Sequence, residues 1–218
     1  GYPREASAVL LVEVDGSEVS VSGISDEVLE VFARHGALET RRAASAEERL
    51  KLWAGRKGAF GAMGRVAPDL YVADAVVPRT KLREMVRTTI EIAARYRLKL
   101  ATVFHAGDGN LHPNICYDRR DADETRRVVE AGEAILAACV AAGGSLTGEH
   151  GIGVEKLGEI GLLFDADDLA AMGRVRRVWD PRLRMNPGKA IPLNACTEIG
   201  DLHIGKAQRS QQQSGATR

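Results

Sequence analysis

The chain has few cysteines, no surplus of charge of either sign and no long apolar run. Its three cysteines, Cys116, Cys139 and Cys196, lie far apart without a C-x-x-C pair, which excludes a zinc ribbon and a disulfide framework. Lys and Arg together number 30, and so do Asp and Glu, so no basic surplus indicates nucleic-acid binding. The longest apolar run, residues 134–142, is far shorter than the ~18 residues that a membrane-spanning helix needs.

Three further motifs are missing. Neither G-x-x-x-x-G-K-[ST] nor G-x-G-x-x-G occurs, so no phosphate-cradling loop is indicated, and the H-E-x-x-H motif of zincin proteases is absent too. No positively charged, apolar leader opens the chain, so we expect a cytoplasmic protein whose association with the inner membrane, if any, is made through partner subunits. Because the first residue is Gly1 rather than Met, we interpret residues 1–192 as a domain that is incomplete at its N-terminus. Residues 193–218 have no apolar face and are predicted to be a disordered tail.

Apolar spacing and capping residues predict a mixed fold. Strands are predicted at residues 8–14, 70–77, 100–105 and 111–117. Helices are predicted at residues 25–36, 45–54, 82–97, 122–142 and 165–179. The last three are each predicted to bury an apolar stripe: Leu82, Met85, Val86, Ile90 and Ala93; Val128, Ala131, Ile135 and Cys139; and Leu169, Met172, Val175 and Trp179. Strands that return through hairpins and single long helices indicate an α+β fold, with an antiparallel sheet and helices packed on one face.

The segment HAGDGNLHPN carries the densest chemistry. His105 and His112 flank a glycine-rich loop, residues 106–110, and directly opposed hairpin residues would bring both imidazoles to one metal ion. Asn114 lies two residues beyond His112 and therefore faces the same side of its strand. Asp108 either fixes the loop or accepts a proton from a ligating imidazole. The alternative is that each histidine is an ordinary surface or core residue.

A second segment, TGEHGIGVEK, follows the Gly143-Gly144 pair. Glu149 and His150 are adjacent, and in a tight turn both can line a cavity. A carboxylate that joins two imidazoles makes a site with open positions, as catalytic Zn²⁺ or Mn²⁺ needs, and leaves the remaining imidazole for acid–base chemistry. The alternative is a polar turn without a ligand.

These two segments, together with NPGKAIP at residues 186–192, resemble the C-terminal domain of FAD-linked oxidases. That family includes the flavin subunit of glycolate oxidase, D-lactate dehydrogenase and D-2-hydroxyglutarate dehydrogenase. The segments LWAGRKGAFGAMGR and DAVVPR match in the same order, so the resemblance covers about residues 1–192. It implies a cap-like domain that covers the flavin and supplies the substrate pocket, with the FAD held mostly by a domain absent from this chain.

The resemblance also implies a role for individual residues. It places a divalent metal, zinc or manganese, on His105, His112 and Glu149, the general base on His150, substrate contacts on Arg56 and Asn114, and flavin-side contacts on Asn186 and Lys189. Relatives specific for 2-hydroxyglutarate hold its distal carboxylate with a threonine and a lysine, where this chain has Phe60 and Val72. We therefore expect the substrate to be a small D-2-hydroxy acid such as glycolate or D-lactate. The resemblance also implies a flavin-binding domain or subunit as partner.

Three alternatives stay open. The same His/His/Glu site would also serve a metal-dependent hydrolase, and bound flavin in a protein with both halves separates the two classes. The chain is alternatively a truncated, non-catalytic fragment. Arg56 lies among Arg49, Lys51 and Lys57 and is alternatively a solvated helix charge, while Lys189 is alternatively part of a surface turn.

Overall fold

The computed structural model describes residues 3 and 5–192, divided between Ala62 and Met63 into two compact units. The first unit contains α1 (Glu18–Arg34) and α2 (Ala46–Lys57), and α3 (Ala59–Met63) follows at the boundary. The predicted tail, residues 193–218, lies outside the described residues.

Two predictions for the first unit need correction. Residues 8–14 form no strand, because no described segment pairs with them, and an extended segment without a hydrogen-bonded neighbour is not a strand. The helix predicted from Ser25 begins eight residues earlier, where the Ser17 side chain accepts a hydrogen bond from the backbone N–H of Ser20. The next helix begins as predicted, since Ser45 accepts from the N–H of Glu48 at 3.2 Å.

The second unit is built on an antiparallel sheet, which confirms the predicted α+β class. The central strand β4 (Asn110–Tyr117) pairs along one edge with β3 (Lys99–His105). Along its other edge it pairs with β1 (Asp69–Val72) and then β2 (Ala75–Val76).

The strand predicted at residues 70–77 is interrupted at Ala73 and Asp74. Val72 opposes Asn114 and Ala75 opposes Leu111, so the register is unchanged across the break. Ala73 lies opposite Pro113 and donates to its carbonyl at 3.1 Å, but proline has no N–H to return a bond. Pro113 therefore interrupts the ladder and places Asp74 across from His112.

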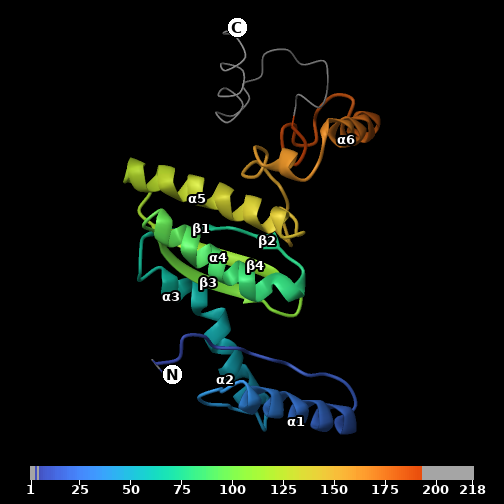
Figure 1. The fold of residues 1–218 in the computed structure, drawn as a ribbon. Helices are drawn as coiled ribbons and strands as arrows, with labels where there is room; N and C mark the ends of the chain where they lie inside the picture. The colour runs from blue at the N-terminus through green and yellow to red at the C-terminus, as the bar shows by residue number, and fades with distance from the viewer. Residues whose placement is uncertain (1–2, 4, 193–218) are drawn as a thin grey trace. The chain divides into compact units, whose positions relative to one another are not determined.

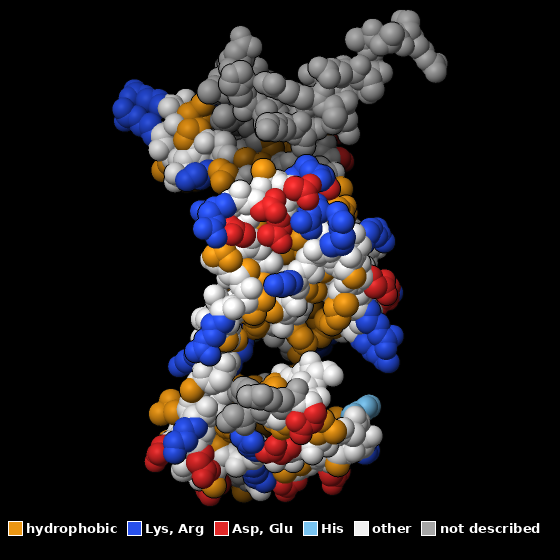
Figure 2. Space-filling model, turned by 90° about the vertical axis from the view of Figure 1, so that its left-hand side faces the viewer, with side chains coloured by type: hydrophobic (Ala, Val, Ile, Leu, Met, Phe, Trp, Pro, Cys, Tyr) orange, Lys and Arg blue, Asp and Glu red, His pale blue; other side chains and the backbone are white. Residues whose placement is uncertain are grey.

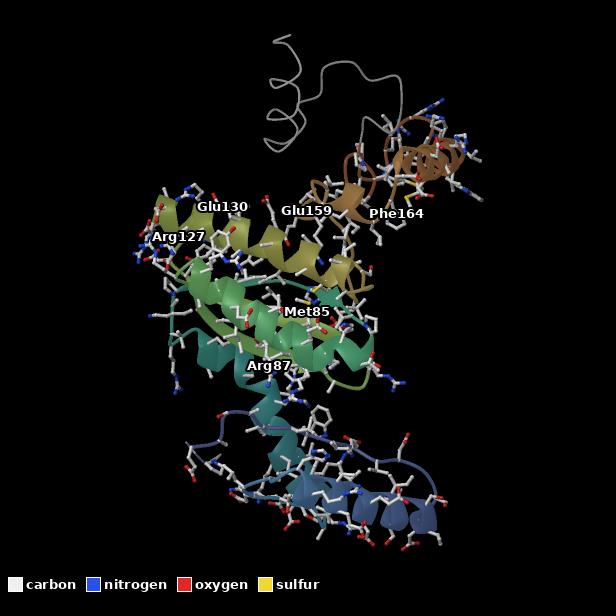
Figure 3. The ribbon with its side chains drawn as sticks, in the orientation of Figure 1. Met85, Arg87, Arg127, Glu130, Glu159 and Phe164 are labelled. Carbon is white, nitrogen blue, oxygen red and sulfur yellow. The ribbon has the colours of Figure 1, made fainter. Side chains whose placement is uncertain are left out.

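Two helices, α4 (Leu82–Arg95) and α5 (Ala122–Ala141), cover one face of this sheet and pack against each other (Figure 1). Figure 3 labels Met85, which lies on α4 and belongs to the core between these layers. The fully buried members of this core include Ala75, Leu111, Ile115, Val128, Ala131, Ile135, Cys139 and Leu146. Each buried Leu or Ile side chain stabilises the fold by about 1.5–3 kcal/mol.

Helix spacing predicted the buried face of α5 correctly and that of α4 in part. The predicted α5 stripe is buried throughout. On α4, however, Ile90 is 55% exposed, and Thr89 is buried in its place. The Thr89 hydroxyl donates to the Val86 carbonyl at 2.8 Å, so a polar residue enters the core without an unpaired donor.

The chain leaves α5 along the edge of the sheet, where Ser145 forms an isolated bridge with Val76. It then passes through the Thr147–His150 turn and a short helix, η2 (Ile160–Leu162), to α6 (Ala166–Trp179). The helix begins at Asp165, as predicted, and Asp165 and Asp168 form a capping box there. The predicted apolar stripe of α6 is not a buried face, since Trp179 is 77% exposed.

Acidic and basic side chains are interspersed on the surface of the second unit, as Figure 2 shows for one side. On α5, for example, Arg126 pairs with both Asp123 and Glu130. Such exposed pairs each contribute about 0–1 kcal/mol and leave no one-signed patch there. Among the described helices, none is long and apolar enough to cross a membrane.

The hairpin between β3 and β4 gives a test of the fold. Gly109 has a φ of +76°, and a Cβ there would lie 2.1 Å from the Val77 carbonyl oxygen. We expect Gly109→Ala to lower the free energy of unfolding by about 2–4 kcal/mol, since it adds left-handed strain to a backbone clash. Gly107→Ala is the matched control, because its Cβ meets nothing within 4 Å. Urea unfolding of both variants measures the difference, and equal losses would contradict the hairpin geometry.

Candidate metal centre and catalytic site

The two histidines of the hairpin lie on the same face of the sheet. His105 opposes Asn110 and His112 opposes Val103, so the imidazoles are diagonal neighbours. The sequence had predicted that they oppose each other directly, and that prediction is wrong. Their ring centroids are nevertheless only 5.5 Å apart, with the rings nearly perpendicular. The His112 side chain is almost fully buried, whereas that of His105 is 44% exposed. Residues alternate along β4, so both histidines face away from α4 and α5.

The Thr147–His150 turn brings a carboxylate to these imidazoles. Glu149 Oε1 lies 3.0 Å from His112 Nε2, 3.7 Å from His105 Nε2 and 3.9 Å from His150 Nε2. The His150 ring stacks on the His112 ring with centroids 5.1 Å apart. The structure thus brings together the four candidate residues of the two segments. The imidazoles of His105, His112 and His150 all lie near Glu149 Oε1.

A fifth group, the Asp74 carboxylate, holds this turn from the break between β1 and β2. It accepts the Thr147 hydroxyl at 2.6 Å and the backbone N–H groups of residues 148–150, with shortest separations of 3.0, 3.2 and 2.9 Å. Lys156 Nζ donates to the Asp74 carbonyl at 2.6 Å and lies 3.3 Å from its carboxylate. Burial alone would raise the pKa of Asp74, but the Thr147 hydroxyl, the His150 N–H and Lys156 hold it well below its usual range. Asp74 is therefore an anion near neutral pH.

Asp74 was not among the site residues predicted from the sequence. The available signals were an acidic residue inside the apolar segment 70–77 and a proline, Pro113, in the strand that pairs with it. Asp74 Oδ1 lies 3.9 Å from His112 Nδ1, an atom without a hydrogen-bond partner among the described residues. Burial lowers the pKa of His112, and the Asp74 carboxylate opposes part of that effect. His112 is accordingly favoured as the neutral imidazole, the form that binds metal ions.

The donor set fits a divalent ion. Within the described part of the chain, ligand atoms of Asp74, His112, Glu149 and His150 all lie within 4.8 Å of one another. The predicted set differs, since it has His105 and neither Asp74 nor His150. Imidazole nitrogens with carboxylate oxygens suit Zn²⁺ or Mn²⁺. Because the turn already occupies Asp74, the carboxylate available to an ion is that of Glu149.

A cavity of about 330 Å³ opens beside this cluster. It is lined by Val76, His105, Asp108, Asn110, Gly148 and Glu149. Asn110 is itself buried, and its Oδ1 has no hydrogen-bond partner in the described residues. This volume is at the small end of ligand sites, as a compact polar metabolite requires.

Asn114, a predicted substrate contact, lies on the same face of β4 as His112. It is fully buried, and its Nδ2 donates to the His112 carbonyl at 2.8 Å, while no described residue donates to its Oδ1. Arg56, the other predicted substrate contact, is a partly exposed residue of α2, in the first unit. Its role stays a prediction from the resemblance.

The predicted flavin-side residues, Asn186 and Lys189, are exposed in the segment after α6. This segment turns sharply, with positive φ at Asn186, Gly188 and Ala190. The Ala190 N–H donates to the Gly153 carbonyl at 2.8 Å, which fixes the segment beside the loop that continues from His150. No described interaction links Asn186 or Lys189 to the histidine cluster, and their roles stay predictions.

Residues 1–190 match the family model of FAD linked oxidases, C-terminal domain, and the chain belongs to that family. The family resemblance inferred from the motifs is thereby confirmed.

Three relatives are particularly informative. Glycolate oxidase subunit GlcD of Escherichia coli (strain K12) is 42% identical over 205 residues, covering 94% of this chain and 41% of that protein. GlcD of Bacillus subtilis (strain 168) is 35% identical over 195 residues, covering 89% and 42%. The mitochondrial D-lactate dehydrogenase [cytochrome] of Arabidopsis thaliana is 28% identical over 189 residues, covering 86% and 33%. The chain spans less than half the length of these curated relatives.

Proposed function

We propose that the chain supplies the substrate-binding and metal-binding portion of an FAD-dependent oxidoreductase that oxidises a small D-2-hydroxy acid. The observation that carries this proposal is the convergence of His112 Nε2 and Glu149 Oε1, 3.0 Å apart, beside His150 and the 330 Å³ cavity. The FAD belongs mostly to a flavin-binding domain or subunit outside this chain. We also propose a cytoplasmic location for the protein.

In this proposal the cluster divides into an ion site and a base. His112 and Glu149, with His105 beside them, hold a zinc or manganese ion. A divalent ion held there supplies positive charge that lowers the pKa of a nearby substrate hydroxyl. His150 removes that hydroxyl proton through Nε2, and imidazole is the side chain that most often acts as a general base. The His150 side chain is 48% exposed, so it is open to a ligand in a way that the buried His112 is not.

Other residues of the chain orient the substrate. Asn114 presents an unpaired Oδ1 beside His112, and Arg56 binds the carboxylate, ideally through two parallel charge-assisted hydrogen bonds. A bound flavin would supply the redox chemistry as acceptor for the C2 hydride. Asn186 and Lys189, in the segment beside Gly153, are the residues of this chain that would contact it.

The proposed substrate is a monocarboxylate of the glycolate or D-lactate type. Val72 on β1 and Phe60 on α3 occupy the positions where relatives specific for 2-hydroxyglutarate are expected to hold the distal carboxylate. An apolar side chain supplies no donor for a carboxylate, and desolvating that charge without a partner is costly. A second carboxylate therefore weakens binding to this site.

The 218-residue chain alone is expected to bind little or no FAD, because NPGK supplies only one edge of a flavin site and no dinucleotide-binding fingerprint is present. Absorbance of the purified chain after incubation with FAD and gel filtration measures this. Flavin retained at one equivalent per chain would contradict the expectation.

The function itself is tested in a protein whose flavin half has been restored by fusion or by adding the separate domain. Mixed anaerobically with glycolate or D-lactate, the flavin absorbance should bleach, whereas D-2-hydroxyglutarate should bleach it far more slowly. A flavin that stays oxidised with all three acids, in a protein that hydrolyses esters in a zinc-dependent manner, would support the hydrolase alternative instead.

A further inference from the structure

Asp74 occupies an unusual place for an acidic residue. It is fully buried in the break between β1 and β2, across from His112. A buried carboxylate is costly unless its oxygens are hydrogen-bonded or paired with positive charge. The groups that hydrogen-bond to the Asp74 carboxylate or neutralise its charge therefore indicate its role in the structure.

The first set of partners is the turn that carries Glu149 and His150. The backbone N–H groups of residues 148–150 all point at this carboxylate, and the Thr147 hydroxyl donates to Oδ2 at 2.6 Å. The same hydroxyl accepts the Gly151 N–H at 2.8 Å, so Thr147 joins the start of the turn to its end. Consecutive N–H groups that converge in this way form an anion-binding concavity, and Asp74 supplies the anion from within the chain.

The second partner is His112. Its Nδ1 is buried and unbonded, and the Asp74 Oδ1 atom lies 3.9 Å away, while its Nε2 faces Glu149 at 3.0 Å. A histidine that binds a metal through Nε2 carries its proton on Nδ1, and the negative charge of Asp74 beside Nδ1 favours that tautomer, although 3.9 Å is too long for a hydrogen bond. Asp74 Oδ2 is the main acceptor for the turn, while Oδ1 accepts the Glu149 N–H at 3.3 Å and is the oxygen nearer to the imidazole.

We infer that Asp74 is a positioning residue, whose carboxylate both shapes the Thr147–His150 turn and orients His112 so that Nε2 and Glu149 meet at one ion. This inference rests on the proposed metal site and adds the residue that assembles it from two distant segments.

The test uses the 218-residue chain and Zn²⁺ alone. Asp74→Asn keeps the side-chain shape and removes the charge, and we expect it to weaken zinc binding by about 10–100-fold in a competitive titration. Without metal, the amide protons of residues 148–150 should also exchange faster with solvent in this variant than in the unmodified chain. Asp180→Asn is the matched control, because Asp180 is another buried carboxylate that accepts two backbone N–H groups, from Arg184 and Met185. It should leave zinc affinity and turn exchange unchanged.

If Asp74→Asn folds poorly, two less disruptive variants of Thr147 test the same inference. Thr147→Val removes the hydroxyl at nearly constant volume and should weaken zinc binding several-fold, whereas Thr147→Ser should restore it. Equal zinc affinity in Asp74→Asn and the unmodified chain, or an equal loss in Asp180→Asn, would overturn the inference. If the unmodified chain binds no zinc, the metal part of the proposed function fails instead, while amide exchange still reports whether Asp74 holds the turn.

Discussion

Replacing His150 with alanine is expected to reduce turnover of the flavin-restored protein by about 10²–10⁴-fold while leaving its metal content unchanged. The side chain is half exposed and stacks on the buried His112 ring, with Nε2 3.9 Å from Glu149 Oε1. Its backbone N–H is fixed by Asp74 at 2.9 Å, so removing the imidazole should leave the turn intact. Stopped-flow flavin reduction together with elemental analysis measures both quantities. The lost rate should recover partly as pH rises, because hydroxide or an already ionised hydroxyl replaces the missing base.

His35→Ala is the matched control for this experiment, because His35 is an exposed residue that ends α1 in the first unit. It should leave turnover within about twofold of the unmodified protein, as surface substitutions usually have small effects. His150 Nε2 lies only 3.9 Å from Glu149 Oε1, close enough for both to bind one ion. If His150→Ala loses its metal while Glu149→Ala keeps it, the two assigned roles are reversed.

Replacing His112 with alanine is expected to abolish stoichiometric metal binding. The imidazole is held in the buried central strand, and its Nε2 lies 3.0 Å from Glu149 Oε1, the shortest histidine–carboxylate separation in the cluster, so its loss removes the central ligand. His105→Ala should also lose the ion, while Glu149→Ala should weaken binding in a way that excess metal partly reverses. Elemental analysis of chains purified without chelator measures this. Equal metal content in the unmodified protein, His105→Ala and His112→Ala would show that the ion, if any, binds elsewhere.

Much of the sheet and its covering helices could be predicted because their signals are local. The apolar stripe of α5 and the glycine-rich loop between β3 and β4 depend on residues close in sequence. The errors arise from long-range pairing. Residues 8–14 have the composition of a strand but no described partner, and the interruption at residues 73–74 depends on Pro113, some forty residues later. Nothing in residues 70–77 alone specifies that break.

The site shows the same division. His105, His112, Glu149 and His150 stand in two short glycine-rich segments, and the structure brings these segments together. Asp74 stands alone in an apolar segment, where a single acidic residue gives no sign of the turn that it binds. Its proposed role depends on its register with β4 and on hydrogen bonds from three backbone N–H groups. Every residue except proline has a backbone N–H, so the sequence does not indicate which of these groups will point at Asp74.

The position of a bound metal ion is the most direct test of the proposed site. In crystals of the zinc-loaded chain, an anomalous difference map should show a peak about 2.0–2.2 Å from His112 Nε2 and from a Glu149 carboxylate oxygen. His150 should lie beside this peak, and Asp74 should keep its hydrogen bonds to the turn. A fully occupied zinc peak elsewhere in the chain, with no peak between His112 and Glu149, would contradict the account.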